Sequence, residues 1–583
     1  MRRLLVTLVL LCVTAVPAFA QEDIVIEALP FTCDKPGTYV LNEDIQATDS
    51  GIHIKSNDVV IDLKGHTLTY GAGVKKNEKA KTYNSLQSGN VGHHAIYVTR
   101  DPRASKDAPT KAGWNYRFTG VVIRNGRIRH GSGKGLAYSD AIDVTGTVGC
   151  EIKELTLEIS APDCSAILGG RQSKIHHCTI RHTGTHVTNR HAQLAVIVSG
   201  PDAEVSDCRL LGGPQVGVKA MSGAEIHHNE IRINVVVTNG YGIQGYGQKN
   251  VHAHHNLIIA ANGRGLHVSE KSTGWNVHHN YIEARERANR EYPKGLDTHG
   301  IKLETCSNAK IYENVVVCES TRRGNPTPLN FGIRAGSRNE VYGNVFVAKK
   351  LTPKERATAI YLVGGDGTGT RIYDNVFFSN DRILEVYWHP GNNFTFSRCR
   401  FYKLNDTDKI TTLYFWNTKP ASNIRFADCV FGDGIDPQAV HFPKTNEKWP
   451  ADANYTVSWT LSFNVKAADQ PVQNAKITVT DKTGNTVTLT TDKNGNTRAA
   501  LDEFTTRFDA AARKAHTKTL SPYVVRIDAP GKPSRTVTLP LTTTTSFTID
   551  LVTGVHQTGA FKDQRPSLEQ LIAKMKKQAG PRR

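Results

Sequence analysis

One short motif recurs along most of this chain and constrains its fold more than any other feature. The motif is an apolar residue, two variable residues, Asn or Cys, and then an apolar stretch. Its Asn or Cys is found at Asn125, Cys178, Cys208, Asn229, Asn256, Asn280, Asn314, Asn344, Asn375, Cys399 and Cys429. A repeat of short apolar stretches at such intervals is typical of a solenoid, in which each repeat forms one coil.

In such a solenoid, each coil lays its strands beside those of the next coil, about 4.8 Å away. Apolar residues that point inward stack into one long core. The Asn residues form a ladder at a tight turn, where their side chains hydrogen-bond from coil to coil, and Cys serves as a small substitute. The sequence therefore predicts an all-β fold with parallel strands.

The repeats resemble those of the right-handed parallel β-helix superfamily, the pectate-lyase-like fold. The resemblance implies a β-helix of about 12–13 coils over residues 21–445, with residues 21–50 as its N-terminal cap. The superfamily includes polysaccharide lyases, glycoside hydrolases, epimerases, esterases and adhesins, so the resemblance is specific for fold and weak for function. Within it, this chain is most similar to the polysaccharide lyases.

Two other segments flank the repeats. Residues 1–20 combine Arg2 and Arg3 with a short apolar run and Ala18-Phe19-Ala20, which is the pattern of a secretory signal peptide. From Tyr455 the pattern changes to alternating strands separated by polar turns, which predicts a small antiparallel β-sandwich over residues 446–552. The phrase QPVQNAKITVTDKTGN resembles transthyretin-like or carboxypeptidase-regulatory-like modules. Residues 553–583 are expected to be a basic tail that can form a helix.

Charge limits the partners of this chain. The formal net charge is +18, and exported basic proteins meet acidic polysaccharides, nucleic acids or anionic surfaces. No nucleic-acid recognition motif is present, and no stretch after the signal is apolar enough to span a membrane. We therefore expect a secreted monomer, extracellular or periplasmic, whose partner is an acidic polysaccharide.

A second motif, of the form GIxx, marks one sheet of the predicted β-helix. If its Ile, Leu or Val points inward, the next residue points outward. One residue per coil then forms an outward column: Tyr97, Asp143, Leu168, Ile197, Lys219, Gln244, His267, Lys302, Arg334, Tyr361, Glu385 and Tyr414. Two residues further along, Tyr246, Ser269, Glu304, Tyr387 and Trp416 also point outward.

The middle of this column suggests an anionic ligand. Stacking basic residues about 5 Å apart is unfavourable unless something anionic lies across them. Aromatic side chains nearby offer flat faces for sugar rings. The predicted substrate-binding residues are Lys219, Gln244, Glu270, Tyr361, Tyr387, Trp416, Arg322 and Arg323.

This column predicts cleavage of a uronate polymer by β-elimination, in which a neutralised carboxylate acidifies the C5 proton and a base removes that proton. Lys302 is the candidate base and Arg334 the carboxylate clamp. The placement of these two residues is similar to the Lys/Arg pair of β-helix alginate and chondroitin lyases. His267 is a candidate base or acid, and Tyr246 a candidate proton donor.

Glu304 keeps other chemistries open. With Glu270 it could bind Ca²⁺ as a cofactor, although no acidic cluster accompanies them. A glycoside hydrolase would need two carboxyl groups about 5–9.5 Å apart, and Glu270 with Glu304 is the candidate pair. A non-catalytic glycan-binding or cell-surface protein is the third alternative.

The His pairs at 227–228, 254–255 and 278–279 suggest stacked imidazoles on another sheet. We interpret them as a surface ladder rather than a metal site.

Overall fold

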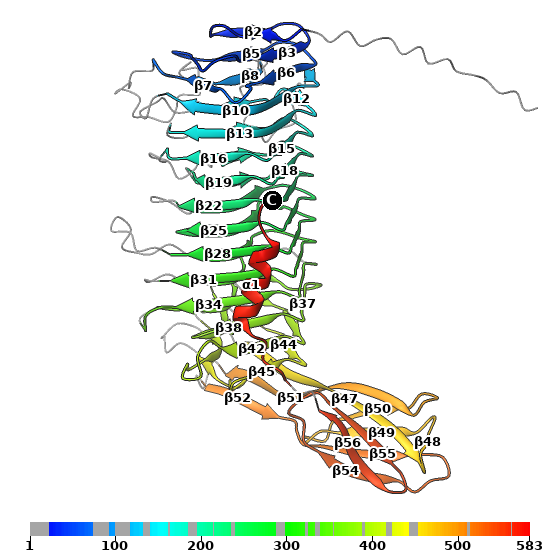
Figure 1. Ribbon diagram of the computed structural model, residues 1–583. Helices are drawn as coiled ribbons and strands as arrows, with labels where there is room; N and C mark the ends of the chain where they lie inside the picture. Colours follow the sequence, from blue (N-terminus) through cyan, green and yellow to red (C-terminus); the bar gives the residue numbers. More distant parts are fainter. Residues whose placement is uncertain are drawn as a thin grey trace, which may run out of the picture.

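A computed structural model describes the chain at residues 22–73, 93–98, 117–131, 140–160, 164–184, 195–213, 215–234, 240–286, 298–320, 325–332, 338–353, 355–387, 391–415, 422–441, 453–509, 514–560 and 563–582. The predicted signal peptide, residues 1–20, therefore lies outside the described residues. The described chain is mostly β-structure; the larger part is stacked in coils along one axis, and the C-terminal strands extend from one end of the stack (Figure 1).

The coils form a parallel β-helix, as the repeats predicted. One strand from each coil joins a single sheet of 15 strands, all parallel, somewhat more than the number of coils expected. In order, these strands are β2 (Phe31–Cys33), β5 (Ile52–Ile54), β8 (Ile96–Val98), β11 (Ile142–Asp143), β14 (Ile167–Leu168), β17 (Ala195–Val198), β20 (Val216–Lys219), β23 (Gly240–Tyr246), β26 (Gly263–Ser269), β29 (His299–Leu303), β32 (Thr327–Phe331), β35 (Thr358–Leu362), β39 (Arg382–Val386), β43 (Thr411–Phe415) and β46 (Val440–His441).

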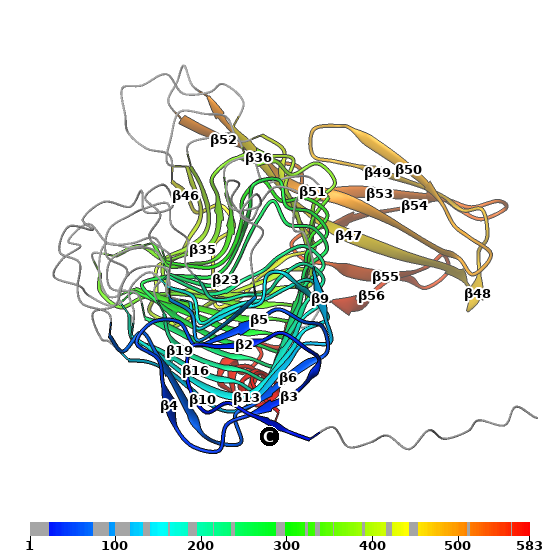
Figure 2. The ribbon, with the colours of Figure 1, turned by 90° about the horizontal axis from the view of Figure 1, so that it is seen from above.

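The remaining walls of each coil are two further short strands. In one central coil, β24 (His252–His254) and β25 (Leu257–Ala261) precede β26 and pair in parallel with β27 (Asn276–His278) and β28 (Tyr281–Arg285) of the next coil. Viewed along the stack, the walls surround a common interior (Figure 2). Equivalent residues of successive coils therefore lie directly beside one another.

The predicted Asn ladder is present at the turn between these two short strands. Asn280 donates from Nδ2 to Asn314 Oδ1 at 2.9 Å and to the Ala253 carbonyl at 2.8 Å, and it accepts from Asn256 Nδ2 at 2.9 Å. The preceding residue, His279, has a φ of 54°, so the chain reverses sharply there. The Asn side chain thus supplies the hydrogen bonds that the turn leaves unmade.

Replacing Asn280 with alanine should lower the free energy of unfolding by about 3 kcal/mol, because buried groups on two neighbouring coils would lose their partners. Urea denaturation followed by circular dichroism measures this loss. Asn42 is exposed, and Asn42→Ala should change the same quantity by less than about 0.5 kcal/mol. Equal effects of the two substitutions would show that the ladder contributes nothing specific to stability.

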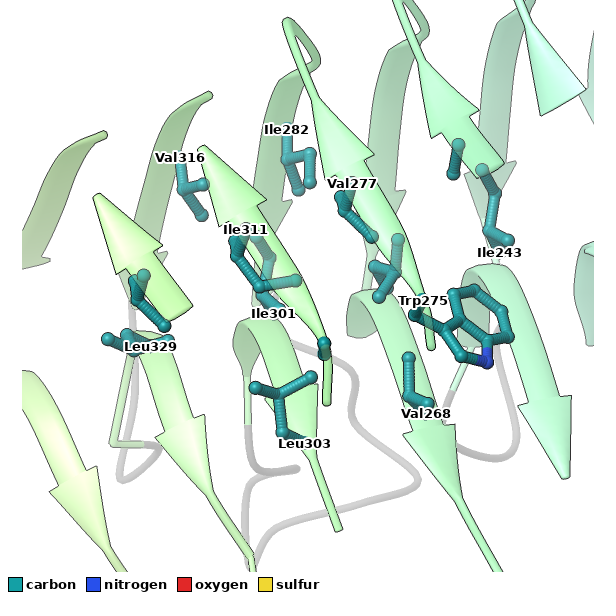
Figure 3. Close-up of a cluster of buried hydrophobic side chains, with 14 of the residues drawn as sticks. Ile243, Val268, Trp275, Val277, Ile282, Ile301, Leu303, Ile311, Val316 and Leu329 are labelled. Carbon is teal, nitrogen blue, oxygen red and sulfur yellow. The ribbon is translucent and has the colours of Figure 1, made fainter. Parts of the chain in front are cut away.

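Branched apolar side chains and one tryptophan fill the interior of the central coils. Figure 3 shows Ile243, Val268 and Trp275 packed together within this interior. All three side chains are fully buried. Trp275 also donates from Nε1 to the Gln248 carbonyl at 3.2 Å, so its polar edge has a partner.

A row of glycines bends the 15-stranded sheet. A Cβ on Gly242 would lie 2.3 Å from Ile258 Cγ2, and one on Gly265 would lie 2.1 Å from Ile282 Cγ2, inside the core. Each glycine and the apolar residue after it therefore both face inward, and the residues on either side of this pair both face outward. Strict alternation along the strand misses this second outward position.

The C-terminal β-structure continues directly from the last coil. The first part of β47 (Asn454–Ala467) pairs in parallel with β44 (Ile424–Ala427) of the stack, and β47 pairs along its length with β51 (Asn496–Asp509) in antiparallel orientation. A separate antiparallel sheet of four strands covers this layer: β50 (Thr486–Thr490), β49 (Lys476–Thr480), β53 (Tyr523–Asp528) and β54 (Arg535–Leu539). The shared strand β47 closes one end of the β-helix core.

The chain then returns along the outside of the β-helix. Helix α1 (Leu568–Gln578) packs against β28 and β31 (Val315–Ser320), as Figure 1 shows. Its apolar residues, among them Met575, cover an outer cluster that includes Tyr281 and Val317. The basic tail therefore packs along a wall of the β-helix other than the 15-stranded sheet.

Candidate active site

Four predicted residues lie side by side on the outer face of the 15-stranded sheet. The strand register pairs Lys219 with Gln244, Gln244 with His267, and His267 with Lys302. Each step is one coil, about 4.8 Å. The structure therefore confirms that these four positions form one column, as the GIxx motif predicted.

Two other positions of that column were wrong. Asn330 pairs with Lys302, at the place predicted for Arg334, because β32 ends at Phe331, before the GIRA segment that imitates the motif. Val198 pairs with Lys219, at the place predicted for Ile197. Four predicted site residues lie outside the described part of the chain: Arg334, Arg322, Arg323 and Trp416.

A chain of polar contacts joins two neighbouring coils at the centre of this face. His267 Nε2 lies 3.1 Å from Glu304 Oε2, and Lys302 Nζ lies 2.8 Å from the same oxygen. On its other side, His267 Nδ1 lies 3.4 Å from Arg264 Nη1. Glu304 therefore interacts with both predicted catalytic partners, Lys302 and His267.

These contacts fix the protonation states of Glu304 and His267. The hydrogen bond from His267 lowers the pKa of Glu304 to about 2, and burial lowers the pKa of His267 to about 4. At neutral pH, Glu304 is thus a carboxylate and His267 an uncharged imidazole that donates from Nε2 to Glu304 and accepts from Arg264 at Nδ1. Both ring nitrogens are engaged, so His267 orients its neighbours and holds no free lone pair for proton transfer.

Lys219 has a different environment from Lys302. Burial lowers the pKa of its half-buried ammonium group. Within the described residues, no carboxylate lies within ion-pair distance of Lys219. By contrast, Lys302 is held in an ion pair with Glu304, which favours its charged form. Of the two lysines, Lys219 is the one suited to accept a proton.

Several buried polar atoms on this face have no hydrogen-bond partner among the described residues. They include both polar atoms of the Gln244 amide, together with Arg264 Nε, Ser269 Oγ and Asn330 Oδ1. Leaving a buried polar group without a partner costs about 1–3 kcal/mol. These atoms lie on β23, β26 and β32, where a polar ligand or water can satisfy them.

The sequence analysis missed a second outward column, which contains Tyr241, Arg264 and His299. These residues pair with one another in register across β23, β26 and β29. The Tyr241 ring stacks on His267 at 5.3 Å, and Asn330 Nδ2 lies 3.3 Å from the His299 ring nitrogens. Burial lowers the pKa of His299. The signal that could have revealed this column is the glycine that opens each motif.

The aromatic candidates lie on either side of the polar group. Tyr246 is half-buried, and its ring meets His267 edge-on at 5.7 Å. Tyr361 and Tyr387 stack on each other at 5.6 Å on later coils. Glu385 lies in register with Tyr361 on the next coil; it is fully buried, accepts from Thr358 Oγ1 at 2.9 Å and has a pKa raised by burial.

Glu270 and Glu304, the predicted carboxylate pair, follow strands β26 and β29 on neighbouring coils. Glu270 is exposed in the turn after β26, with a φ of 56°. No group of three or more His, Cys, Asp or Glu side chains in the described chain is placed to hold a metal ion. Glu304 follows β29 and Glu385 lies in β39, three coils further along the stack, a rise of about 14 Å.

A second polar cluster, the His ladder, lies on another wall. His227, His254 and His278 pair in register and stack at 5.0 and 4.8 Å. The following residues, His228 and His255, stack at 4.9 Å. The row continues through His279, and beyond His278 through Tyr312, Tyr342 and Tyr373. The ring faces cover one another, so only ring edges are available to solvent.

The neutral histidines should make the fold sensitive to acid. The pKa values of His228, His255, His267 and His278 are lowered from 6.5 to about 4, in each case mainly by burial. Between pH 6.5 and 4 the unfolded chain therefore binds more protons than the folded chain, so stability falls as the pH falls through this window. Urea midpoints should decrease steadily between about pH 7 and about pH 4.5. His278→Gln should flatten this dependence, and a midpoint unaffected by pH would contradict it.

One comparison with known proteins bears on the fold. Residues 50–282 match the family model described as a right-handed beta helix region. Together with the stacked parallel sheets, this match makes the fold a right-handed parallel β-helix followed by a small antiparallel β-structure. No curated protein matches the chain. In the described residues, no helix is long and apolar enough to cross a membrane.

Three solved structures are similar to this chain. The Dettilon tailspike protein is 12% identical, with 88% of this chain and 78% of that one covered and a TM-score of 0.35. PfbA, a surface adhesin of Streptococcus pneumoniae, is 11% identical, with 80% and 90% covered and a TM-score of 0.30. A tailspike protein of E. coli bacteriophage HK620, in complex with a pentasaccharide, is 10% identical, with 85% and 87% covered and a TM-score of 0.31.

Proposed function

We propose that this protein is a carbohydrate-active enzyme that cleaves an acidic, uronate-containing polysaccharide by β-elimination on the outer face of the 15-stranded sheet. The observation that carries the proposal is Lys219, a half-buried lysine with a lowered pKa and no carboxylate partner among the described residues. It lies one coil from the unpartnered amide of Gln244. Lys219, the proposed base, therefore lies next to a buried amide whose donor and acceptor a substrate can satisfy.

Positive charge on this face supports an anionic substrate. On the four coils from β20 to β29, Lys219, Arg264 and Lys302 outnumber the carboxylates of Glu270 and Glu304, and His267 and His299 are uncharged at neutral pH. A substrate carboxylate would bind near the Gln244 amide and the unpartnered Nε of Arg264. Neutralising that carboxylate acidifies the adjacent C5 proton of the uronate. Lys302, held by Glu304, adds positive charge without giving up its proton.

In the proposed step, the neutral amine of Lys219 removes the C5 proton of the uronate. The electron pair left on C5 forms a double bond to C4, and the bond between C4 and the glycosidic oxygen breaks. The Tyr246 phenol donates its proton to the departing oxygen, and solvent later returns that proton to Tyr246 and takes one from Lys219. No water is added, so the new end of the chain is an unsaturated sugar.

The spacing of the carboxylates favours elimination over hydrolysis. A glycoside hydrolase needs two carboxyl groups about 5–9.5 Å apart. Glu304 and Glu385 are separated by three coils, a rise of about 14 Å, and Glu270 is exposed in a turn. Within the described residues, Lys219 and Tyr246 are better placed as a base and an acid than any pair of carboxylates.

We also propose that the protein works as an exported monomer. The support is the signal-like segment of residues 1–20 and the basic charge that suits an extracellular or periplasmic acidic glycan. N-terminal sequencing of the native protein should begin near Gln21. A native protein that begins at Met1 would contradict export through a cleaved signal.

The direct test of the proposed function is a screen of purified protein on alginate, pectate, chondroitin, hyaluronan and ulvan. An elimination produces an unsaturated sugar that absorbs ultraviolet light. A hydrolase releases reducing ends without this absorbance, and a binding protein does neither but retains the glycan. Ultraviolet-absorbing products from one or more acidic glycans would support the proposal, and reducing ends alone would overturn it.

A further inference from the structure

The His ladder brings imidazole nitrogens together in pairs. Nδ1 of His227 lies 2.9 Å from Nδ1 of His228, and the corresponding distance is 3.0 Å for His254 and His255. The two rings of each pair are nearly perpendicular, at 90° and 86°. The second residue of each pair has a φ of 54–55°, which turns its side chain back toward the first. The third pair, residues 278–279, has the same geometry at 2.9 Å.

Hydrogen bonds to carboxylates set the tautomers of two of these imidazoles. Two carboxylates fix part of the protonation pattern, because Glu225 accepts from His254 Nε2 at 3.1 Å and Glu313 accepts from His279 Nε2 at 2.7 Å. Nδ1 of His254 and Nδ1 of His279 are therefore lone pairs that face their neighbours.

The spacing fits two adjacent ligands of one metal ion. Metal–imidazole bonds are about 2.0–2.1 Å, so two nitrogens about 3 Å apart subtend roughly 90° at the metal. That angle belongs to square-planar and octahedral geometry, which Cu²⁺ and Ni²⁺ prefer. In the described residues no third His, Cys, Asp or Glu completes a closed site, so water would fill the remaining positions.

We propose that the pairs His254/His255 and His278/His279 form an open binding site for a divalent transition metal ion, with Cu²⁺ bound more tightly than Ni²⁺ or Zn²⁺. Each pair offers two Nδ1 atoms. In His255 and His278, which are not held by these carboxylates, the ring proton moves from Nδ1 to Nε2 when the metal binds. No proton or electron is lost from the pair. Because adjacent dications about 5 Å apart repel, we expect one ion per chain.

The C-terminal tail contacts the first pair, His227/His228, and so makes it different from the two proposed metal-binding pairs. Arg582 Nη2 lies 3.0 Å from His228 Nδ1, and Gly580 N donates to the His255 carbonyl at 2.9 Å. The guanidinium therefore occupies the position that a metal ion would take at His227/His228 and repels a cation there. The charge of Arg582 also reaches His255, but among the described residues no cation forms a hydrogen bond with Nδ1 of either later pair.

The test is calorimetric titration of untagged, full-length protein with Cu²⁺, Ni²⁺, Zn²⁺ and Mg²⁺ chlorides. We expect one Cu²⁺ per chain at micromolar affinity or tighter, weaker Ni²⁺ and Zn²⁺, and no Mg²⁺. The double variant His255→Gln/His279→Gln should bind Cu²⁺ at least about ten-fold more weakly. The control His516→Gln/His556→Gln removes two exposed histidines of the C-terminal β-structure and should bind like the wild type.

Electron paramagnetic resonance of the Cu²⁺ complex gives an independent readout, because two imidazole nitrogens should split the axial signal. Circular dichroism checks that each variant is folded. If the double variant fails to fold, His279→Gln alone, whose ring is 31% exposed, should still weaken binding. Unchanged Cu²⁺ affinity in a folded ladder variant, or a loss confined to the control variant, would overturn the proposal.

Discussion

Replacing Lys219 with alanine should reduce the rate of elimination on the best acidic polysaccharide by about 100- to 10,000-fold, the range typical for removal of a general base. The reason is that Lys219 combines a pKa lowered by burial with the absence of a carboxylate partner in the described chain. Steady-state kinetics from ultraviolet absorbance measure the loss. Circular dichroism should show an unchanged fold, because the ammonium group makes no ion pair there that the substitution would break.

Arginine at the same position separates catalysis from binding. Lys219→Arg keeps a positive charge on the face but cannot take up a proton, since a guanidinium stays charged at any pH of interest. We expect Lys219→Arg to be about as slow as Lys219→Ala while binding substrate nearly as well as the wild type. An arginine variant with near wild-type kcat would restrict Lys219 to substrate binding.

The second large effect concerns stability. Trp275→Ala should lower the free energy of unfolding by about 3–5 kcal/mol, because it empties a large volume in the core and removes a hydrogen-bond donor to Gln248. Activity should fall with it. The ring lies under Gly245, which separates Gln244 from Tyr246 in β23. Urea denaturation and the elimination assay measure the two effects.

A double-mutant cycle tests whether the ring and this glycine act together. A Cβ on Gly245 would lie 2.2 Å from Trp275 Cζ2, so Gly245→Ala alone should be destabilising. In the background of Trp275→Ala that cost should largely disappear, which gives a coupling energy of at least about 1 kcal/mol. Additive effects would show that the ring does not support the floor of the site.

Sequence reasoning was most successful where the coil repeat imposes the position. The Asn ladder follows from the repeat, because a buried turn needs a side chain that donates to the neighbouring coils, and Asn256 and Asn280 do this. The same repeat placed Lys219, Gln244 and His267 in one column, since equivalent residues of successive coils must stack. Both predictions rest on spacing alone.

Sequence reasoning failed where local geometry departs from the repeat. Arg334 was assigned to a strand by its motif, but β32 ends at Phe331 and Asn330 holds the position. The column with Arg264 and His299 was missed because the inward-facing glycines break the alternation. Neither the Lys302–Glu304 ion pair nor the burial of Lys219 can be read from spacing, which is why the sequence suggests Lys302 as the base whereas we propose Lys219.

The most direct test of the central claim is the mass of the products from the most rapidly cleaved acidic polysaccharide. Elimination splits a glycosidic bond without adding water, whereas hydrolysis adds one water for each bond cut. If the cationic column around Lys219 performs β-elimination, one fragment of each cleavage will be a water lighter than its hydrolytic counterpart, and these fragments will be absent with Lys219→Ala. Fragments that all carry the added water, or light fragments that persist at full yield with Lys219→Ala, would contradict the account.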